Sequence, residues 1–270
     1  MSDHGSIKRG YLEGRTGQVH YRYYGRADGI PLVLLHQSPL SGCQFDAVLP
    51  RLAARGYRVL APDMPGFGMS DSAPEGATLE DFASIIDAVR SEWPGRPVNL
   101  VGHHTGAVLA AVFAAAHPAA VNKIVLNGFP LLGEAERRHF ASFYFGPKEP
   151  KLDGSHLLIA WETRLRSTPG WTDLHLMHRY TVEALHRGET NWKAFPLVIA
   201  ADLQAVLLRL EVPTLLFTNS GEDLYAATRR AYELRRDFFR YAELPGGTHD
   251  IVDEQPDPWV EIIDHFLQVP

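Results

Sequence analysis

The chain has 270 residues, of which 45% are hydrophobic, and a formal net charge of −6. This length allows one large domain, or one domain with an inserted cap, around a substantial buried core, and we expect the second arrangement. The acidic balance, without a run of lysines and arginines that could follow phosphates, argues against nucleic acid as a partner. The single cysteine, Cys43, excludes an internal disulfide framework and a cysteine-rich zinc site, and it fits a reducing compartment.

The sequence shows no membrane segment. Its first residues contain no apolar run, and no later stretch reaches the uncharged length that spans a bilayer. We therefore expect a cytoplasmic protein without membrane contact, whose partner is a small-molecule substrate. The sequence is also compatible with a homodimer.

The first half of the chain alternates between apolar strands and helices. Residues 18–24 have the two-residue period of a strand, and residues 45–54 have helical spacing. Further segments of these kinds are strands at 32–35, 58–61, 98–101 and 121–126, and helices at 79–93 and 107–116. This alternation predicts an α/β fold with a mostly parallel sheet and helices on both faces.

The alternation stops after residue 128 and resumes near residue 211. The interruption contains helical pieces at 155–166 and 172–186, and residues 192–210 are expected to return the chain to the sheet. The remaining expected elements are a strand at 213–217, a helix at 225–238, a strand at 241–244 and a helix at 259–267. We therefore predict a core domain of residues 1–128 and 211–270 and a helical cap of residues 129–210.

One motif decides which chemistry is available. Residues Gly102-His103-His104-Thr105-Gly106 have the spacing G-x-S-x-G, with His104 in the place of the serine. An apolar strand precedes the motif and an alanine-rich helix follows it, ending before Pro118. The two glycines would allow the strand and the helix to approach closely within a tight turn.

Four further motifs accompany this one in a fixed order. They are His36-Gln37-Ser38-Pro39 after an early strand, Asp63-Met64-Pro65-Gly66-Phe67-Gly68-Met69-Ser70-Asp71, the turn within residues 213–223, and Gly246-Gly247-Thr248-His249 before the last helix. In this order the five motifs resemble those of the α/β-hydrolase superfamily, over nearly the whole chain apart from the cap. The resemblance implies an eight-stranded sheet with a helical cap after the sixth strand, and a nucleophile elbow at residues 102–106.

The resemblance also implies partners for His104. The family places an acid after the penultimate strand and a histidine after the last one, which gives Asp223 and His249. The turn 219–223 is about one residue longer than the usual family turn, so Glu222 is an alternative to Asp223. An acid in this turn could instead cap the helix that follows.

Oxyanion and substrate contacts are expected from the early loop, the elbow and the cap. The backbone N–H groups of Ser38 and Thr105 are expected to face a developing oxyanion, with Gln37 in the same loop and His36 bracing it. Trp161 is expected to line an apolar pocket in the cap. Four cap arginines are interpreted as solvated helix faces, any one of which could pair with a substrate carboxylate: Arg137, Arg138, Arg164 and Arg166.

Four roles of His104 remain open. As a nucleophile it would attack an activated carbonyl and form an acyl-imidazole that water cleaves. As an acid or base beside His249 it would activate water or remove a substrate proton, which allows hydrolysis, a lyase reaction or C–C bond cleavage. As a metal ligand it would need His249 with His36 or a cap histidine, but the spacing shows no H-E-x-x-H motif and no carboxylate pair. The fourth role is that of a non-catalytic binding protein that has lost its serine.

The motifs together favour hydrolysis of a small ester or lactone through His104, Asp223 and His249. A lyase reaction and ligand binding without catalysis are the alternatives. We expect no organic cofactor because the chain lacks a phosphate-cradling glycine loop, and we expect no metal.

Overall fold

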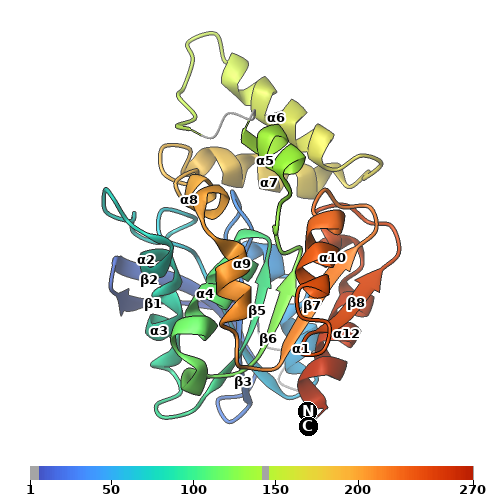
Figure 1. The fold of residues 1–270 in the computed structure, drawn as a ribbon. Coiled ribbons are helices and arrows are strands. Elements are labelled where there is room, and N and C mark those ends of the chain that lie inside the picture. The colour runs from blue at the N-terminus through green and yellow to red at the C-terminus, as the bar shows by residue number, and fades with distance from the viewer. Residues whose placement is uncertain (1–5, 142–145, 270) are drawn as a thin grey trace.

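An eight-stranded sheet forms the centre of the structure, a computed structural model that describes residues 6–141 and 146–269. The strand order is β1-β2-β4-β3-β5-β6-β7-β8 (Figure 1). The strands are β1 Lys8–Gly14, β2 Gly17–Tyr24, β3 Ile30–Leu35, β4 Tyr57–Pro62, β5 Val98–His103, β6 Val121–Asn127, β7 Thr214–Asn219 and β8 Arg240–Leu244. Strand β2 pairs antiparallel with β1 and β4, and all other pairs are parallel. The predicted mostly parallel α/β sheet is confirmed.

The central strands are covered on both faces. In β3, Val33 and Leu35 belong to one apolar cluster, and Leu32 and Leu34 to the other, because successive side chains of a strand point to opposite faces. All six residues of β5 are buried. A strand without a solvent face reads as the continuous apolar run seen in the sequence.

Helices form the two covering layers and the region above the sheet. They are the short turns η1 Gly42–Phe45 and η2 Pro118–Ala120 and the helices α1 Leu49–Ala53, α2 Leu79–Ala83, α3 Ile85–Arg90, α4 Thr105–Ala116, α5 Glu134–Ala141, α6 Ser155–Ser167, α7 Leu174–His186, α8 Ala194–Ala200, α9 Leu203–Leu208, α10 Tyr225–Glu233, α11 Ile251–Glu254 and α12 Pro256–Gln268. Helices α2, α3, α4, α8, α9 and α10 contribute to one apolar cluster, and α1, α11 and α12 to the other. Helices on both faces are therefore confirmed.

Several expected helices are shorter or broken. The helix expected at 79–93 divides at Ser84, whose hydroxyl donates to the carbonyl of Asp81. The segment 192–210, which was expected to return the chain to the sheet, forms the two helices α8 and α9, and Asp202 caps the second by accepting from the N–H of Ala205. Local hydrogen bonds from such side chains compete with helix continuation.

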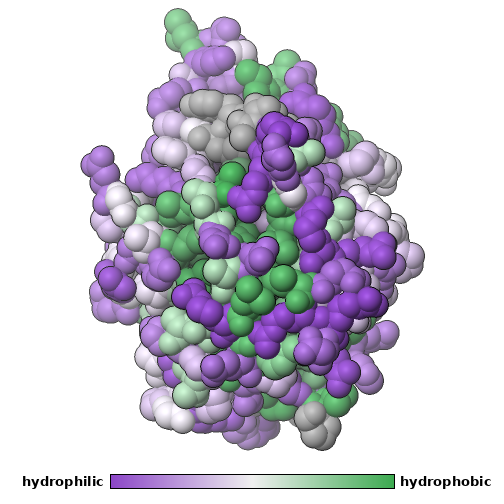
Figure 2. All heavy atoms as spheres, in the orientation of Figure 1, coloured by the Kyte–Doolittle hydropathy of each residue, from purple (hydrophilic) through white to green (hydrophobic). Residues whose placement is uncertain are grey.

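Helices α5, α6 and α7, together referred to below as the cap, lie above the carboxyl ends of the strands (Figure 1). Helix α8 packs against α2 and α4, and α9 packs against α4, so the chain descends along the core before it enters β7. Exposed apolar side chains are frequent on α6, and Figure 2 shows green side chains at the cap end of the molecule. In the part of the chain that the structure describes, no helix combines the length and the apolar character needed to cross a membrane.

Candidate active site

His104 lies at a strained turn between β5 and α4. Its backbone has φ 51° and ψ −109°, and it is the one positive-φ residue other than glycine in the described part of the chain. A Cβ atom at Gly102 would lie 2.2 Å from the carbonyl oxygen of Gly106, and one at Gly106 would lie 2.0 Å from that of Leu35. Both glycines are therefore required by the close approach of the backbones. Strain of this kind persists only where the surroundings enforce it, and it concentrates at functional sites.

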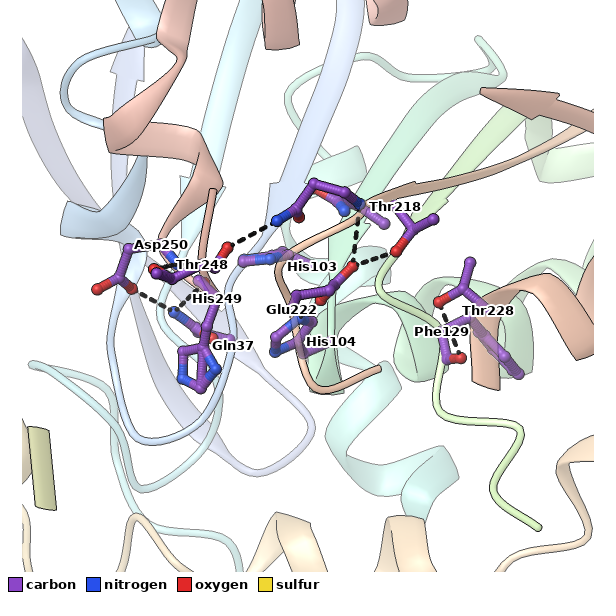
Figure 3. Close-up of polar contacts among 12 residues, drawn as sticks. Gln37, His103, His104, Phe129, Thr218, Glu222, Thr228, Thr248, His249 and Asp250 are labelled. Atoms are coloured by element: carbon purple, nitrogen blue, oxygen red, sulfur yellow. Dashed lines mark hydrogen bonds and ion pairs between the residues drawn. The ribbon is translucent and has the colours of Figure 1, made fainter. Parts of the chain in front are cut away.

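The His104 side chain is held by a buried carboxylate. Its Nε2 atom lies 2.6 Å from Oε2 of Glu222, whose side chain is completely buried (Figure 3). The other oxygen, Oε1, accepts from the Thr218 hydroxyl at 2.5 Å and from the Asn219 N–H at 3.4 Å. With Nε2–H donating to Glu222, neutral His104 keeps its lone pair on Nδ1.

The structure brings Glu222, and not Asp223, to the histidines. The N–H of Glu222 donates to the carbonyl of Asn219 at 3.3 Å, and this turn folds the Glu222 side chain back toward the end of β7. The next side chain, that of Asp223, is exposed to solvent. The expected pairing of Asp223 with His249 is therefore corrected, because the longer turn places the preceding acid in the site and this acid bonds to His104.

Gly128, which lies outside the five sequence motifs, makes room for this pair. It follows β6 with φ 64°, and a Cβ atom there would lie 2.2 Å from Cδ2 of His104 and 2.9 Å from Oε2 of Glu222. The elbow is tied to the same strand end, since the His104 N–H donates to the carbonyl of Asn127 at 2.8 Å. In the sequence, this role is indicated only by the position of the glycine directly after a buried strand.

His249 approaches His104 from the loop after β8. The two rings meet edge to face, with centroids 5.3 Å apart and an interplanar angle of 85°. Burial lowers the pKa of His249 well below its usual range, and the charges of His104 and Arg164 lower it further. His249 is therefore neutral near pH 7, and within the described part of the chain no carboxylate binds its ring.

The expected oxyanion loop adjoins these histidines. His36 braces it, since its Nε2 atom accepts from the Met64 N–H at 2.9 Å and its Nδ1 atom donates to the carbonyl of Gln37 at 2.9 Å. The amide of Gln37 donates to the carbonyl of His249 at 3.3 Å. The loop after β3 is thereby fastened to the loop after β8.

Two backbone N–H groups are available where the oxyanion was expected. Among residues 6–141 and 146–269 neither the N–H of Ser38 nor that of Thr105, the first residue of α4, has an acceptor. The hydroxyl of Ser38 is also buried without a partner among these residues. Unused donors at a helix start suit a developing negative charge.

A metal site fits this group of residues poorly. His103, His104 and Glu222 each offer a ligand atom, and these atoms lie within 4.8 Å of one another. However, the Gln44 carbonyl oxygen accepts from the Gln37 N–H, so the Gln44 amide donates to Nδ1 of His103 at 2.5 Å. Neutral His103 then carries its proton on Nε2 and has no free lone pair, and both ring nitrogens of His36 are likewise occupied.

The cap contributes two side chains of interest on α6. Trp161 is half-buried, and Arg164 follows it by three residues, on the same side of the helix. Arg164 is buried and forms an ion pair with Asp250, the residue after His249. The interpretation of Arg164 as part of a solvated helix face is therefore wrong, and the sequence had left open which of the cap arginines could pair with a substrate carboxylate.

Known proteins resemble this chain in parts of their sequence and in overall structure. A haloalkane dehalogenase of Mycobacterium marinum is 34% identical over 157 residues, which cover 54% of this chain and 51% of that protein. The (E)-2-((N-methylformamido)methylene)succinate hydrolase of Acinetobacter baylyi is 34% identical over 110 residues, which cover 39% of this chain and 40% of that protein. These matches thus span about half or less of the length of the relatives.

The structural likeness extends over the whole chain. An enol-lactonase of Burkholderia xenovorans superposes with a TM-score of 0.78 at 19% identity, covering 96% of this chain and 100% of that protein. Epoxide hydrolase A of Mycobacterium thermoresistibile gives a TM-score of 0.79 at 19% identity, covering 97% and 98%. At these identities the likeness establishes the fold. The family model for the alpha/beta hydrolase fold matches residues 30–194, and the chain belongs to that family.

Proposed function

We propose that this protein hydrolyses a small ester or lactone by general-base catalysis, with His104 as the base and Glu222 as the residue that orients it. The observation that carries the proposal is the 2.6 Å contact between Nε2 of His104 and the buried Glu222 carboxylate. A carboxylate in this position fixes the tautomer and stabilises the imidazolium that forms during proton transfer. The named succinate-derivative hydrolase among the partial relatives supports a hydrolytic reaction.

A base role suits His104 better than a nucleophilic role. Its Nε2 atom is committed to Glu222, so only Nδ1 is free to react. Nδ1 is bonded to Cγ, the ring carbon attached to Cβ, so the space around it is crowded. A small water molecule fits there more readily than the acyl carbon of a substrate. Water activation also needs no covalent intermediate.

The proposed reaction is balanced by one water molecule. Nδ1 of His104 takes a proton from water while the water oxygen bonds to the carbonyl carbon, and the carbonyl electron pair moves to oxygen. The N–H groups of Ser38 and Thr105 donate to this oxyanion. As the C–O bond to the leaving group breaks, imidazolium returns the proton to the leaving alkoxide, and an acid and an alcohol result.

His249 is proposed to assist the leaving group. Its ring meets that of His104 at 5.3 Å between centroids, and its lowered pKa keeps it neutral, so it can accept one proton and donate another. A neutral imidazole between His104 and the leaving oxygen could relay the proton. This role predicts a smaller loss for the His249 variant than for the His104 variant.

The test is turnover of p-nitrophenyl acetate and δ-valerolactone by the wild type, His104→Ala and His249→Ala, with the exposed His117→Ala as the control. We expect a loss of about 10²- to 10⁴-fold in kcat for His104→Ala, a smaller loss for His249→Ala and none for the control. Intact mass spectrometry on quenched enzyme distinguishes the roles of His104. An acyl adduct on His104 would replace the base mechanism by a nucleophilic one, and absence of turnover in the wild type would overturn the proposed function.

A further inference from the structure

Arg164 differs from the other cap arginines in its surroundings. It projects from α6 toward the core and is 8% exposed. Arg137 binds the carbonyls of Leu132 and Ile199, Arg138 pairs with Glu134 at the surface, and Arg166 is exposed. Burial lowers the pKa of Arg164 to about 10, so its side chain is still cationic at neutral pH.

The partners of Arg164 leave part of its guanidinium unused. Its Nη2 atom pairs with Oδ2 of Asp250, whose other oxygen accepts from the Gln37 amide at 3.1 Å. The guanidinium lies over the ring of Tyr180, 4.9 Å from the centroid. Its Nε–H is buried without an acceptor among the described residues. A guanidinium has five N–H donors, and a buried donor without an acceptor is costly.

The nearby acids do not supply the missing acceptor. Asp253 accepts from the Tyr180 hydroxyl, and Glu254 accepts from both the N–H and the hydroxyl of Thr248. Both oxygens of Glu254 and one oxygen of Asp253 are therefore already engaged with other donors.

Arg164 also lies close to the reacting histidines. Gln37, on the loop after β3, donates to the carbonyl of His249 and to the carboxylate of Asp250 (Figure 3). It therefore fastens the loop after β3 to the partner of Arg164. The positive charge of Arg164 contributes to the lowered pKa of His249 and of His103. Because Asp250 directly follows His249, a guanidinium paired with Asp250 lies on the His249 side of the site.

We propose that Arg164 binds a carboxylate of the substrate, so that the ester or lactone hydrolysed here carries a negative charge. This inference rests on the proposed function, which it makes more specific. The planar guanidinium matches a carboxylate through two parallel hydrogen bonds. Trp161, one helical turn earlier, offers an apolar wall for the carbon chain that joins the carboxylate to the scissile bond.

The experiment compares two esters that differ in this charge, mono-p-nitrophenyl succinate and p-nitrophenyl valerate. We expect the wild type to prefer the succinate ester by about tenfold or more in kcat/KM. Arg164→Met should lower kcat/KM for the succinate ester by about 10- to 100-fold, chiefly through KM, with a smaller loss for the valerate ester. Arg166→Met, on the exposed side of the same helix, is the matched control and should change neither rate.

Parallel losses for both esters in Arg164→Met would overturn the inference, because a purely structural contact between cap and core predicts them. If this variant does not fold, Arg164→Lys replaces it. That variant keeps the charge but loses the planar fork, and we expect an intermediate loss confined to the succinate ester.

A binding measurement separates this inference from the proposed function. Calorimetry with succinate on His104→Ala should show binding, and on His104→Ala/Arg164→Met a tenfold or greater loss of it. Succinate binding without turnover of any ester by the wild type would overturn the function and leave the carboxylate site standing. Turnover of esters with no succinate binding and no charge preference would overturn the carboxylate site and leave the proposed function standing.

Discussion

The core holds one buried pair, His104 with Glu222, and the junction of cap and core holds another, Arg164 with Asp250, and the two pairs are built differently. In the core, Glu222 receives His104, the Thr218 hydroxyl and a backbone N–H from three directions. At the cap, Arg164 reaches across to Asp250 and keeps an unpartnered Nε–H. Because both oxygens of Glu222 have donors, the pair of His104 and Glu222 is fixed in one geometry. Because Arg164 keeps a donor without an acceptor, its pair with Asp250 can bind a further acceptor group. The proposed chemistry thus belongs to the core, and the proposed recognition belongs to the cap.

The largest expected effect comes from breaking the core pair. Glu222→Gln removes the negative charge beside Nε2 of His104 and should lower kcat for ester hydrolysis by about 10²- to 10⁴-fold. Asp223→Asn, one residue later and exposed, is the matched control and should stay within about twofold. Steady-state kinetics on p-nitrophenyl acetate measures both. A large loss in Asp223→Asn with an active Glu222→Gln would reverse the assignment of the acid.

The next effect tests how tightly the core pair is enclosed. Gly128→Ala places a methyl group 2.2 Å from the His104 ring at φ 64°, so we expect a loss of about 2–4 kcal/mol in unfolding free energy together with most of the activity. Gly154→Ala, in the cap at φ 73° with nothing within 4 Å, measures the backbone cost alone, about 1 kcal/mol. Urea unfolding of the two variants gives the difference. Equal losses of unfolding free energy in the two variants would mean that His104 and Glu222 can shift to accommodate the added methyl group.

The smallest effect is a difference in the response to pH. Burial lowers the pKa of His36, His103 and His249, so below about pH 6.5 the unfolded chain binds protons that the folded chain does not. Stability should therefore fall on acidification, by at most ~1.4 kcal/mol per pH unit for each histidine. At the cap junction, burial raises the pKa of Asp253 to about 6, so below that pH its folded-state protonation opposes part of the loss.

Urea unfolding between pH 7.5 and 5 tests this difference between core and cap junction. Asp253→Asn should make the fall below pH 6 steeper, while His249→Gln should make it shallower. A free energy of unfolding that stays level or rises on acidification would contradict the burial of neutral histidines in the core.

The sequence predicts well those elements whose burial is uniform. The apolar runs of β3 and β5 and the glycines at 102 and 106 are sufficient because core packing and close backbone approach depend on residue type alone. Strand β1 escaped notice because it begins with Lys8 and Arg9 and contains Gly10, and it gains its order from pairing with β2. Edge strands of this kind show weak periodicity.

The site was predicted less completely because it depends on which way single side chains point. The length of the turn after β7 left Asp223 and Glu222 as alternatives, and only the fold of that turn shows that the Glu222 side chain points to His104. The role of Gly128 arises from contact with residues distant in the sequence. The choice of Arg164 among the cap arginines needed the position of Asp250, on a loop after the last strand.

The order of the strands has a consequence for how this protein can change. Strands β6 and β7 are parallel neighbours, so any connection between them must cross from one end of the sheet to the other. Helix α9, packed on α4, already makes that crossing, and α5, α6 and α7 are an insertion within it. Such an insertion can lengthen, shorten or change sequence without altering the register of any strand pair. Substrate preference can therefore diverge in this lineage while the turn that carries His104 keeps its geometry.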